Sequence, residues 1–248
     1  MSSQRDIMRE SAHRPFPMPA GRWLMFQSWR DLLFGSWRVS HSVLRLLVPA
    51  RLRIDEFDRA PWVTLAPFVI TGLRFRLMPP LPGLSTFGEL NLRTYVTYDG
   101  VPGVFFFTLD ASSRIAVAAA RRFYKLPYRQ AHIDVKRRDG WVEYHSRRSK
   151  GFAELKARYR PTGEPFEAAP ETLDHFLAER YALYTVDENG SVWRGDIHHA
   201  RWPLQRAEAE VEINTVSGAH GIPRPRERPV VHYAARQDTL IWPLKRVG

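Results

Sequence analysis

The chain contains no cysteine, which excludes disulfide bonds and thiolate metal sites. It also lacks a glycine-rich phosphate loop and a GxGxxG motif, the usual signatures of nucleotide binding. The longest charge-free hydrophobic run, residues 60–73, is about 14 residues long and contains prolines, whereas a membrane-spanning helix needs roughly 20. The N-terminus has no apolar core of the kind that a secretory signal requires. We therefore expect a cytoplasmic protein that has no membrane span and needs no cofactor.

Basic residues outnumber acidic residues in this chain. The formal net charge is +11, and thirteen basic residues lie between Arg121 and Arg160 against only four acidic ones. Such a region is a candidate surface for nucleic acid or an anionic membrane. However, no zinc-finger spacing or RNP-like motif accompanies it, and charged and apolar residues alternate over residues 152–160 as on a half-exposed strand. Nucleic-acid binding is therefore kept only as an alternative.

Hydrophobic periodicity predicts a chain made mostly of strands. We expect a loose tail over residues 1–20 and a single domain over residues 21–248, with no internal repeat. Helices are predicted at residues 41–48, 114–124 and 171–181, and a short helix leading into a strand at residues 23–37. Strands are predicted at residues 52–57, 62–75, 89–98, 103–109, 131–136, 141–146, 151–160, 183–186, 192–196, 206–213, 230–234 and 240–242. The predicted fold class is α+β, built on a mostly antiparallel sheet.

The adjacent pair His198 and His199 raises the question of a metal site. Neighbouring residues on a strand face opposite ways, so the two imidazoles cannot readily bind one ion together. No HExxH motif or second histidine cluster supports them. We predict no metal site.

Several segments together resemble a known family. They are Glu89-Leu-Asn-Leu-Arg-Thr-Tyr-Val, Gly103-Val-Phe-Phe-Phe-Thr-Leu-Asp-Ala, Arg121-Arg-Phe-Tyr-Lys-Leu-Pro-Tyr128, Trp29-Arg-Asp-Leu-Leu-Phe34, His199-Ala-Arg-Trp-Pro-Leu-Gln205 and the C-terminal Val231–Leu244. They resemble the YqjF-like family of uncharacterised bacterial proteins (domain of unknown function 2071), which is placed in the acetoacetate decarboxylase-like superfamily. The resemblance covers nearly everything after residue 21. It implies a barrel- or cone-like sheet with helices packed outside and a ligand cavity within.

The resemblance also implies where the site lies. In the decarboxylase, a lysine directly after a proline forms an imine with the substrate ketone, and a neighbouring lysine lowers its pKa. The matching segment here is Leu126-Pro127-Tyr128-Arg129, so Tyr128 replaces the imine-forming lysine and Arg129 its neighbour. A phenol cannot form an imine, and a guanidinium stays protonated. The decarboxylase chemistry is therefore not expected.

Two further residues match the decarboxylase site. Glu89 falls at the family's glutamate position, and burial there would raise its pKa and make it a general acid or base. Arg38 aligns with a site arginine. The alternative for Glu89 is a solvated strand-end carboxylate, or an ion-pair partner of Arg93 or Arg129.

The two residues that follow Pro127 have alternatives of their own. Tyr128 could bind a carbonyl or carboxylate, or it could be an aromatic core residue. Arg129 could hold a carboxylate through paired hydrogen bonds, or it could belong to the basic strand face. On an extended segment these two side chains point opposite ways. Lys125 would also point away from Tyr128, so a displaced imine-forming lysine is not favoured.

The leading hypothesis is a small-molecule-binding domain or enzyme acting on an organic acid or carbonyl compound without an imine. Glu89 would be the catalytic residue, with Arg38, Tyr128 and Arg129 binding the substrate. An enzyme of this kind would be a lyase- or hydrolase-type acid/base catalyst. The alternatives are a non-catalytic ligand sensor and a nucleic-acid-associated basic protein. The sequence leaves open whether the protein forms a homo-oligomer.

Overall fold

The computed structural model describes residues 4–80, 84–225 and 227–248. The helices are α1 (Gln4–Arg9), α2 (His41–Leu47), α3 (Arg114–Tyr124), α4 (Leu173–Ala178) and the 3-10 turn η1 (Gly218–His220). The strands are β1 (Met25–Arg38), β2 (Arg53–Ile54), β3 (Glu56–Phe57), β4 (Ala60–Phe75), β5 (Phe87–Tyr98), β6 (Val101–Ala111), β7 (Tyr128–Arg138), β8 (Trp141–Arg148), β9 (Glu154–Pro161), β10 (Ala182–Val186), β11 (Val192–His198), β12 (Gln205–Asn214), β13 (Val230–Ile241) and β14 (Lys245–Arg246). No described helix is long and apolar enough to cross a membrane.

The strands pair into a closed circuit. Its order is β6–β7–β8–β9–β12–β13–β1–β4–β5, and β5 pairs back onto β6. Strands β10 and β11 make a shorter bridge between β6 and β13. Apart from the β6–β7 and β6–β10 pairs, the strand pairs around the ring are antiparallel. The predicted α+β class on a mostly antiparallel, cone-like sheet is confirmed.

The first long strand corrects one prediction. Residues 23–37 were expected to begin as a short helix, but β1 is extended from Met25 to Arg38 and buried along most of its length. A strand that is covered on both faces carries apolar residues at nearly every position, and such a run does not distinguish strand from helix. Pairing with β4 and β13 on its two edges decides the conformation.

Helix α3 has the bounds that the sequence predicted. The Ser113 hydroxyl accepts a hydrogen bond from the Ala116 amide and caps the first turn. Lys125 ends the helix in the left-handed conformation, with φ of 52°. This turn sends the chain directly into Pro127 and β7, so the end of α3 positions Tyr128.

Part of the segment expected to be a loose tail is packed on the body of the protein. Ile7 is buried beside Trp23 and Trp242. Arg14 is also buried, and its guanidinium donates to the carbonyl oxygen of Ile197 at 2.7 Å. A few such contacts outweigh the polar composition from which the tail was predicted.

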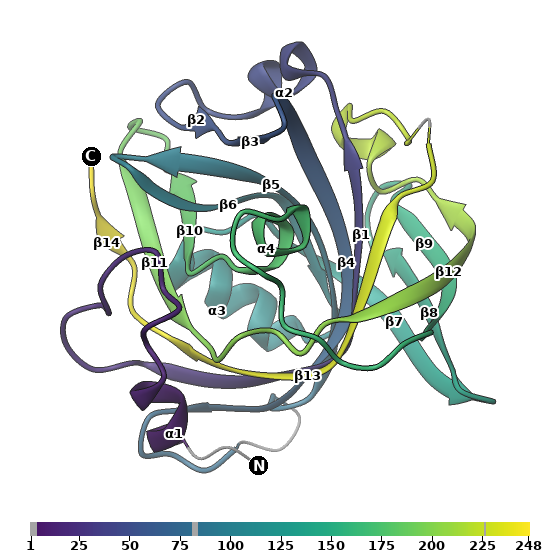
Figure 1. Cartoon of the computed structure of the whole chain (residues 1–248), viewed down its shortest axis with the longest axis horizontal. Coiled ribbons are helices and arrows are strands. Elements are labelled where there is room, and N and C mark those ends of the chain that lie inside the picture. The colour runs from purple at the N-terminus through teal and green to yellow at the C-terminus, as the bar shows by residue number, and fades with distance from the viewer. Residues whose placement is uncertain (1–3, 81–83, 226) are drawn as a thin grey trace.

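Helix α4 lies in the middle of the ring in Figure 1. Leu177 on this helix is fully buried among residues that include Tyr95 and Leu126. Its carbonyl oxygen accepts hydrogen bonds from Arg93 and Tyr95 of β5. The helix therefore covers one face of β5 and shields the side chains on that face from solvent.

Strand β5 packs against hydrophobic clusters on both of its faces. Leu90, Leu92 and Val96 belong to the larger cluster on one face. Phe87 and Tyr95 belong to clusters on the opposite face. Because side chains alternate along a strand, Glu89, Asn91 and Arg93 also lie on the face of Phe87 and Tyr95. Polar residues thus occupy the middle of an otherwise apolar face.

Candidate functional site

Glu89 is buried near the start of β5, with 3% of its surface exposed. The hydroxyl of Tyr128, at the start of β7, donates a hydrogen bond to Glu89 Oε2 at 3.0 Å. The hydroxyl of Tyr144 on β8 holds the backbone of the same residue by donating to the Glu89 carbonyl oxygen at 2.7 Å. The structure therefore brings together the two residues that the resemblance placed in one site, and it fixes the glutamate from two sides.

The surroundings of Glu89 favour its neutral form. Burial raises its pKa from the ordinary 4.5 to about 8, and nearby Asp110 adds to the rise. Hydrogen bonds from Tyr128 and Asn91 act in the opposite direction and only partly offset it. Burial and the adjacent glutamate also raise the pKa of Tyr128 well above its usual value. Near neutral pH the pair thus holds two protons, and Glu89 titrates in the range that general acid–base catalysis uses.

Several buried polar atoms on this face of β5, or packed against it, have no hydrogen-bond partner within the described residues. They are Asn91 Oδ1, Arg93 Nε, Trp62 Nε1 and Trp202 Nε1. Trp62 is 4% exposed and Trp202 is 2% exposed. Most buried polar atoms in proteins are hydrogen-bonded, so a group of unpartnered ones needs a specific explanation. A polar ligand between these side chains would supply one.

Arg93 lies two residues beyond Asn91 on the same face of β5. One Nη2 hydrogen bond of 3.1 Å ties it to the Leu177 carbonyl oxygen of α4. Its guanidinium also lies over the rings of Phe34, at 5.2 Å, and Tyr95, at 5.9 Å. No ion pair joins Arg93 to a carboxylate in the part of the chain that the structure describes. Glu89 is therefore not its ion-pair partner, one of the alternatives open at the sequence level.

The two other predicted binding residues lie apart from the pair. Arg38 is exposed at the end of β1, and its guanidinium lies 5.3 Å from the ring of Trp62. Arg129 is exposed and is in register with Asp110, on the opposite face of the sheet from Tyr128. The alternation expected along the extended segment thus separates Arg129 from Tyr128. Arg38 thus contacts Trp62, whose indole nitrogen is one of the unpartnered atoms.

Lys125 and the histidine pair His198 and His199 form contacts away from Glu89 and Tyr128. Lys125 Nζ donates to Asp187 at 3.2 Å and lies over the ring of Trp193. His198 contacts Arg14 and the Ile7 carbonyl oxygen. His199 contacts the carbonyl oxygens of Ala200 and Arg180. Within the described residues, no group of histidine and carboxylate side chains is arranged to hold a metal ion.

A separate buried ion pair lies behind the site. Asp110 is 1% exposed. Arg148 donates to its two carboxylate oxygens at 3.0 and 3.1 Å, and Thr108 donates at 2.8 Å. Asp110 pairs with Leu90 in register, so it lies on the opposite face of the sheet from Glu89. Its charge is already satisfied by these donors, which favours a structural role.

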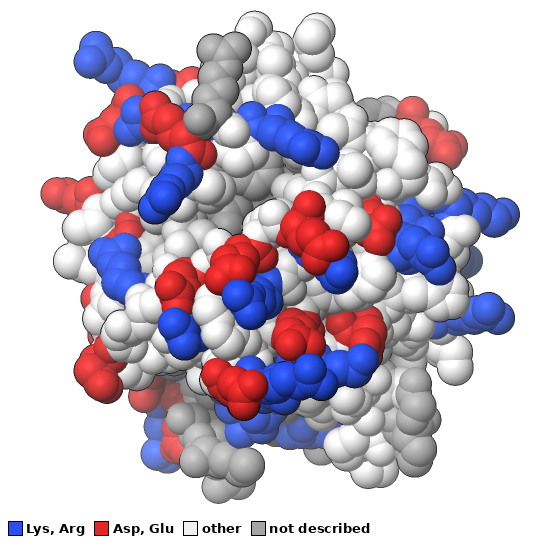
Figure 2. All heavy atoms as spheres, turned by 90° about the vertical axis from the view of Figure 1, so that its right-hand side faces the viewer, with Lys and Arg blue, Asp and Glu red and all other residues white. Residues whose placement is uncertain are grey.

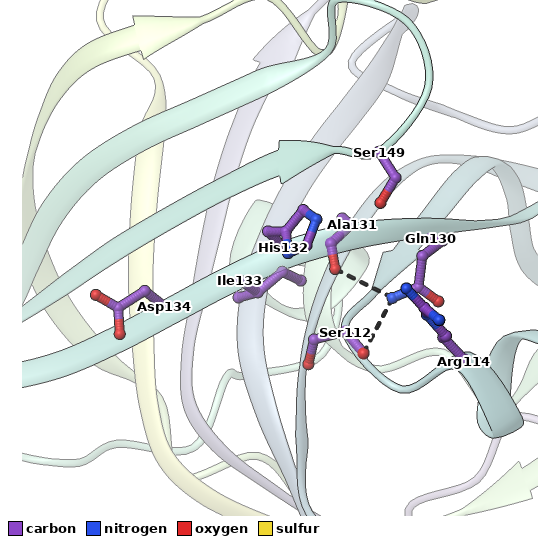
Figure 3. Close-up of a pocket in the computed structure, with 8 residues that line it drawn as sticks. All are labelled: Ser112, Arg114, Gln130, Ala131, His132, Ile133, Asp134 and Ser149. Carbon is purple, nitrogen blue, oxygen red and sulfur yellow. Dashed lines mark hydrogen bonds between the residues drawn. The ribbon is translucent and has the colours of Figure 1, made fainter.

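Two surface pockets lie outside the Glu89–Tyr128 pair. One encloses about 310 Å³ beside the start of α3 and is lined mostly from β7 (Figure 3). There the Gln130 amide donates to the carbonyl oxygens of Ser112 and Ala131. The other encloses about 700 Å³ over β8, β9 and β12. Neither pocket is lined by Glu89 or Tyr128.

The basic region forms a ladder of ion pairs. Arg160, Arg158 and Lys156 of β9 pair with carboxylates of the neighbouring strand β12, at Glu208, Glu210 and Glu212 respectively. Figure 2 shows blue and red side chains next to each other across this face. A surface whose cations are matched by carboxylates attracts a polyanion weakly, which speaks against the nucleic-acid alternative. Three cations of the basic region are therefore matched by carboxylates that lie about fifty residues further along the chain.

A family model described as "Uncharacterized conserved protein (COG2071)", DUF2071, matches residues 26–238. The chain belongs to the DUF2071 family. It is 47% identical to "Uncharacterized protein YqjF" of Bacillus subtilis (strain 168) over 230 residues, which cover 92% of this chain and 95% of that protein. The resemblance stated from sequence is thus confirmed for this DUF2071 protein.

Solved structures show the fold. Acetoacetate decarboxylase from Legionella pneumophila matches with a TM-score of 0.63 at 14% identity, covering 94% of this chain and 93% of that one. The "Enduracididine biosynthesis enzyme MppR complexed with pyruvate" matches with a TM-score of 0.64 at 10% identity, covering 93% and 92%. At these identities the DUF2071 protein shares the fold of both enzymes, and the likeness alone assigns no activity to it.

Sequence reasoning missed most of the polar surroundings of Glu89. Asn91 and Arg93 were read as part of a strand pattern, although the i, i+2, i+4 spacing from Glu89 places all three on one face. Trp62 and Trp202 are distant in sequence, and only strand pairing and the packing of Trp202 against Phe34 bring their indoles to this face. The alternation along β5 was the one sequence signal that could have identified two of these four residues, Asn91 and Arg93.

Proposed function

We propose that this DUF2071 protein binds a small organic acid or carbonyl compound at Glu89 and Tyr128 and exchanges a proton with it. The observation that carries the proposal is the 3.0 Å hydrogen bond from the partly buried Tyr128 to the buried Glu89, on a strand face where polar atoms lack partners among the described residues. Burying a carboxyl group costs stability. Carboxyl groups whose pKa is strongly shifted by burial are frequent at functional sites, where the shift tunes their proton affinity.

The chemistry follows from the protonation states. A neutral Glu89 that accepts a hydrogen bond from Tyr128 still has its own proton to donate to a ligand carbonyl oxygen. After donation, the resulting carboxylate can take a proton from the carbon next to that carbonyl, so the residue serves as acid and then as base. Tyr128 remains protonated throughout and orients the carboxyl group.

No lysine takes part in the proposed reaction. Tyr128 occupies the position after Pro127, and Lys125 is held by Asp187 and Trp193. Support for a small carbonyl ligand in this fold comes from the enzyme MppR, whose structure was solved as a complex with pyruvate.

A thermal-shift screen of keto and hydroxy acids against wild type and Glu89→Gln tests the proposal. Binding to the folded state raises Tm, and we expect the substitution to reduce that rise. If the same ligands stabilise both proteins equally, the site is not at Glu89. Ligand stabilisation without any turnover would assign the protein to the sensor alternative.

A second assay tests the absence of an imine. Incubation with acetoacetate followed by borohydride should leave the protein mass unchanged and release no carbon dioxide. A mass adduct on Lys125 would contradict the proposed route and identify a displaced nucleophile.

A further inference from the structure

The interior face of β5 carries Arg93, which forms no ion pair with a carboxylate among the described residues. Arg93 is partly buried, and its Nε is sealed from solvent without a hydrogen-bond partner among the described residues. Its protein contacts are one carbonyl oxygen and two aromatic rings. Most interior arginines are paired with a carboxylate, because a buried charge without a counter-ion is costly. In this chain, Arg148 and Arg180 follow that rule with Asp110 and Asp55.

The polar groups that flank Arg93 on β5 and α4 do not supply the counter-ion, and the carboxylate of Asp55 is already paired with Arg180. Asn91, two residues before it on the same face, is neutral. Glu89 forms no ion pair with Arg93 and is hydrogen-bonded to Tyr128 instead. The Leu177 carbonyl oxygen accepts from Nη2 but carries only a partial charge.

Other unpartnered donors stand on the same side of the sheet. Phe34, which lies under the Arg93 guanidinium, packs edge-to-face against Trp202 at 5.0 Å between ring centroids. Tyr95, the second ring under Arg93, belongs to the same cluster as Trp62. The indole Nε1 atoms of both tryptophans are buried without an acceptor within the described chain. A guanidinium with nearby N–H donors that need acceptors is suited to an anion.

We infer that Arg93 is the residue that holds the anionic group of the ligand, with Asn91 between it and the proton-transferring Glu89. This inference rests on the function proposed above and assigns its specificity: a carboxylate at the Arg93 end and a carbonyl or hydroxyl group at the Glu89 end. The exposed Arg38, which the alignment with the decarboxylase put forward, does not hold the anion.

Three probes separate the two ends of the site. Propanoate has the charge without the ketone, methyl pyruvate has the ketone without the charge, and pyruvate has both. Binding is measured by ligand-observed NMR and by tryptophan fluorescence in wild type, Arg93→Met, Arg93→Lys, Glu89→Gln and Arg38→Met. The lysine variant keeps the charge and shows whether any effect of the methionine comes from misfolding.

We expect Arg93→Met to weaken propanoate and pyruvate by about 10- to 100-fold, the usual effect of losing a charge-assisted hydrogen bond. Methyl pyruvate should bind that variant as it binds wild type, and Arg93→Lys should recover part of the propanoate affinity. Glu89→Gln should weaken methyl pyruvate and leave propanoate unchanged. Arg38→Met should bind all three probes as wild type does.

The outcomes that overturn the inference differ from those that overturn the proposed function. Propanoate that does not bind wild type, that binds Arg93→Met unchanged, or that is lost in Arg38→Met would refute the role of Arg93. Ketone binding that is insensitive to Glu89→Gln would instead refute the function proposed for Glu89, whatever Arg93 does.

Discussion

Tyr128 donates a hydrogen bond to Glu89, which lies 39 positions earlier in the sequence. The two residues meet because β6 pairs with β5 on one edge and with β7 on the other. The register pairs Ala111 with Glu89 and Leu109 with Tyr128, which brings the starts of β5 and β7 together at the end of β6. The helix between β6 and β7 ends with a left-handed turn at Lys125 and returns the chain to this point.

The stability of the protein should fall as pH rises through the titration of Glu89. Its folded-state pKa of about 8 lies above the ordinary 4.5, so the folded chain binds this proton more tightly than the unfolded chain. The resulting stabilisation is fully present below pH 4.5 and is lost as pH rises to about 8, by up to about 5 kcal/mol. Urea unfolding of wild type and Glu89→Gln between pH 5 and pH 8.5 measures it.

Glu89→Gln should make the free energy of unfolding much less dependent on pH in this window. Glu212→Gln, which removes an exposed carboxylate on β12, serves as the control and should keep the wild-type dependence. A pH dependence that survives Glu89→Gln would show that another group is responsible.

Removing the Tyr128 hydroxyl should shift the titration of Glu89. The hydrogen bond from Tyr128 lowers the pKa of Glu89, so Tyr128→Phe should raise that pKa above 8 and move the pH–stability curve to higher pH. It should also cost about 1 kcal/mol. Tyr144→Phe removes a buried hydroxyl that bonds backbone atoms, among them the Glu89 carbonyl oxygen, and not the Glu89 carboxyl group. That variant should be destabilised similarly without moving the curve, and equal movement in both variants would refute the specific role of Tyr128.

Gly88 should tolerate no side chain while Ile133 is present. A Cβ on Gly88 would lie 2.4 Å from Ile133 Cγ2, so Gly88→Ala should destabilise the protein by about 1–3 kcal/mol. Combined with Ile133→Ala, the cost should be less than the sum of the single substitutions. Gly163→Ala, where the nearest atom is 4.0 Å away, is the control and should change the thermal stability little. Strict additivity in the double variant would contradict the contact.

The ion-pair ladder should keep polyanions off the β9–β12 face. Wild type is expected to elute from heparin at low salt despite its net charge of +11. The triple variant Glu208→Gln, Glu210→Gln and Glu212→Gln frees three cations on one face and should elute at clearly higher salt. The control carries Glu164→Gln, Glu188→Gln and Glu227→Gln. These substitutions raise the net charge by the same amount, but at positions that are spread over the chain. Equal retention of the two variants would show that only total charge matters.

The sequence alone determined most of the secondary structure, and its resemblance to a known family singled out Glu89 and Tyr128, which the structure brings into contact. Alternation of apolar and polar residues predicted the strands because a half-buried strand imposes period two. The cap residues before Arg114 predicted α3 correctly because they satisfy amide groups that the first turn leaves free. Local patterns of this kind depend only on nearby residues. The helix expected at residues 23–37 was wrong, because this strand is covered on both faces and the pattern loses its period there.

Only the tertiary structure decided how the site is composed. Whether Glu89 is neutral depends on burial by residues from other strands, and whether Arg93 has a counter-ion depends on which carboxylates the fold brings near it. The same is true of the basic region, where three cations of β9 are paired with carboxylates of β12, about fifty residues further on. Electrostatics acts through space, so a residue's charge state and partners follow from the closed circuit of strands and not from its neighbours along the chain.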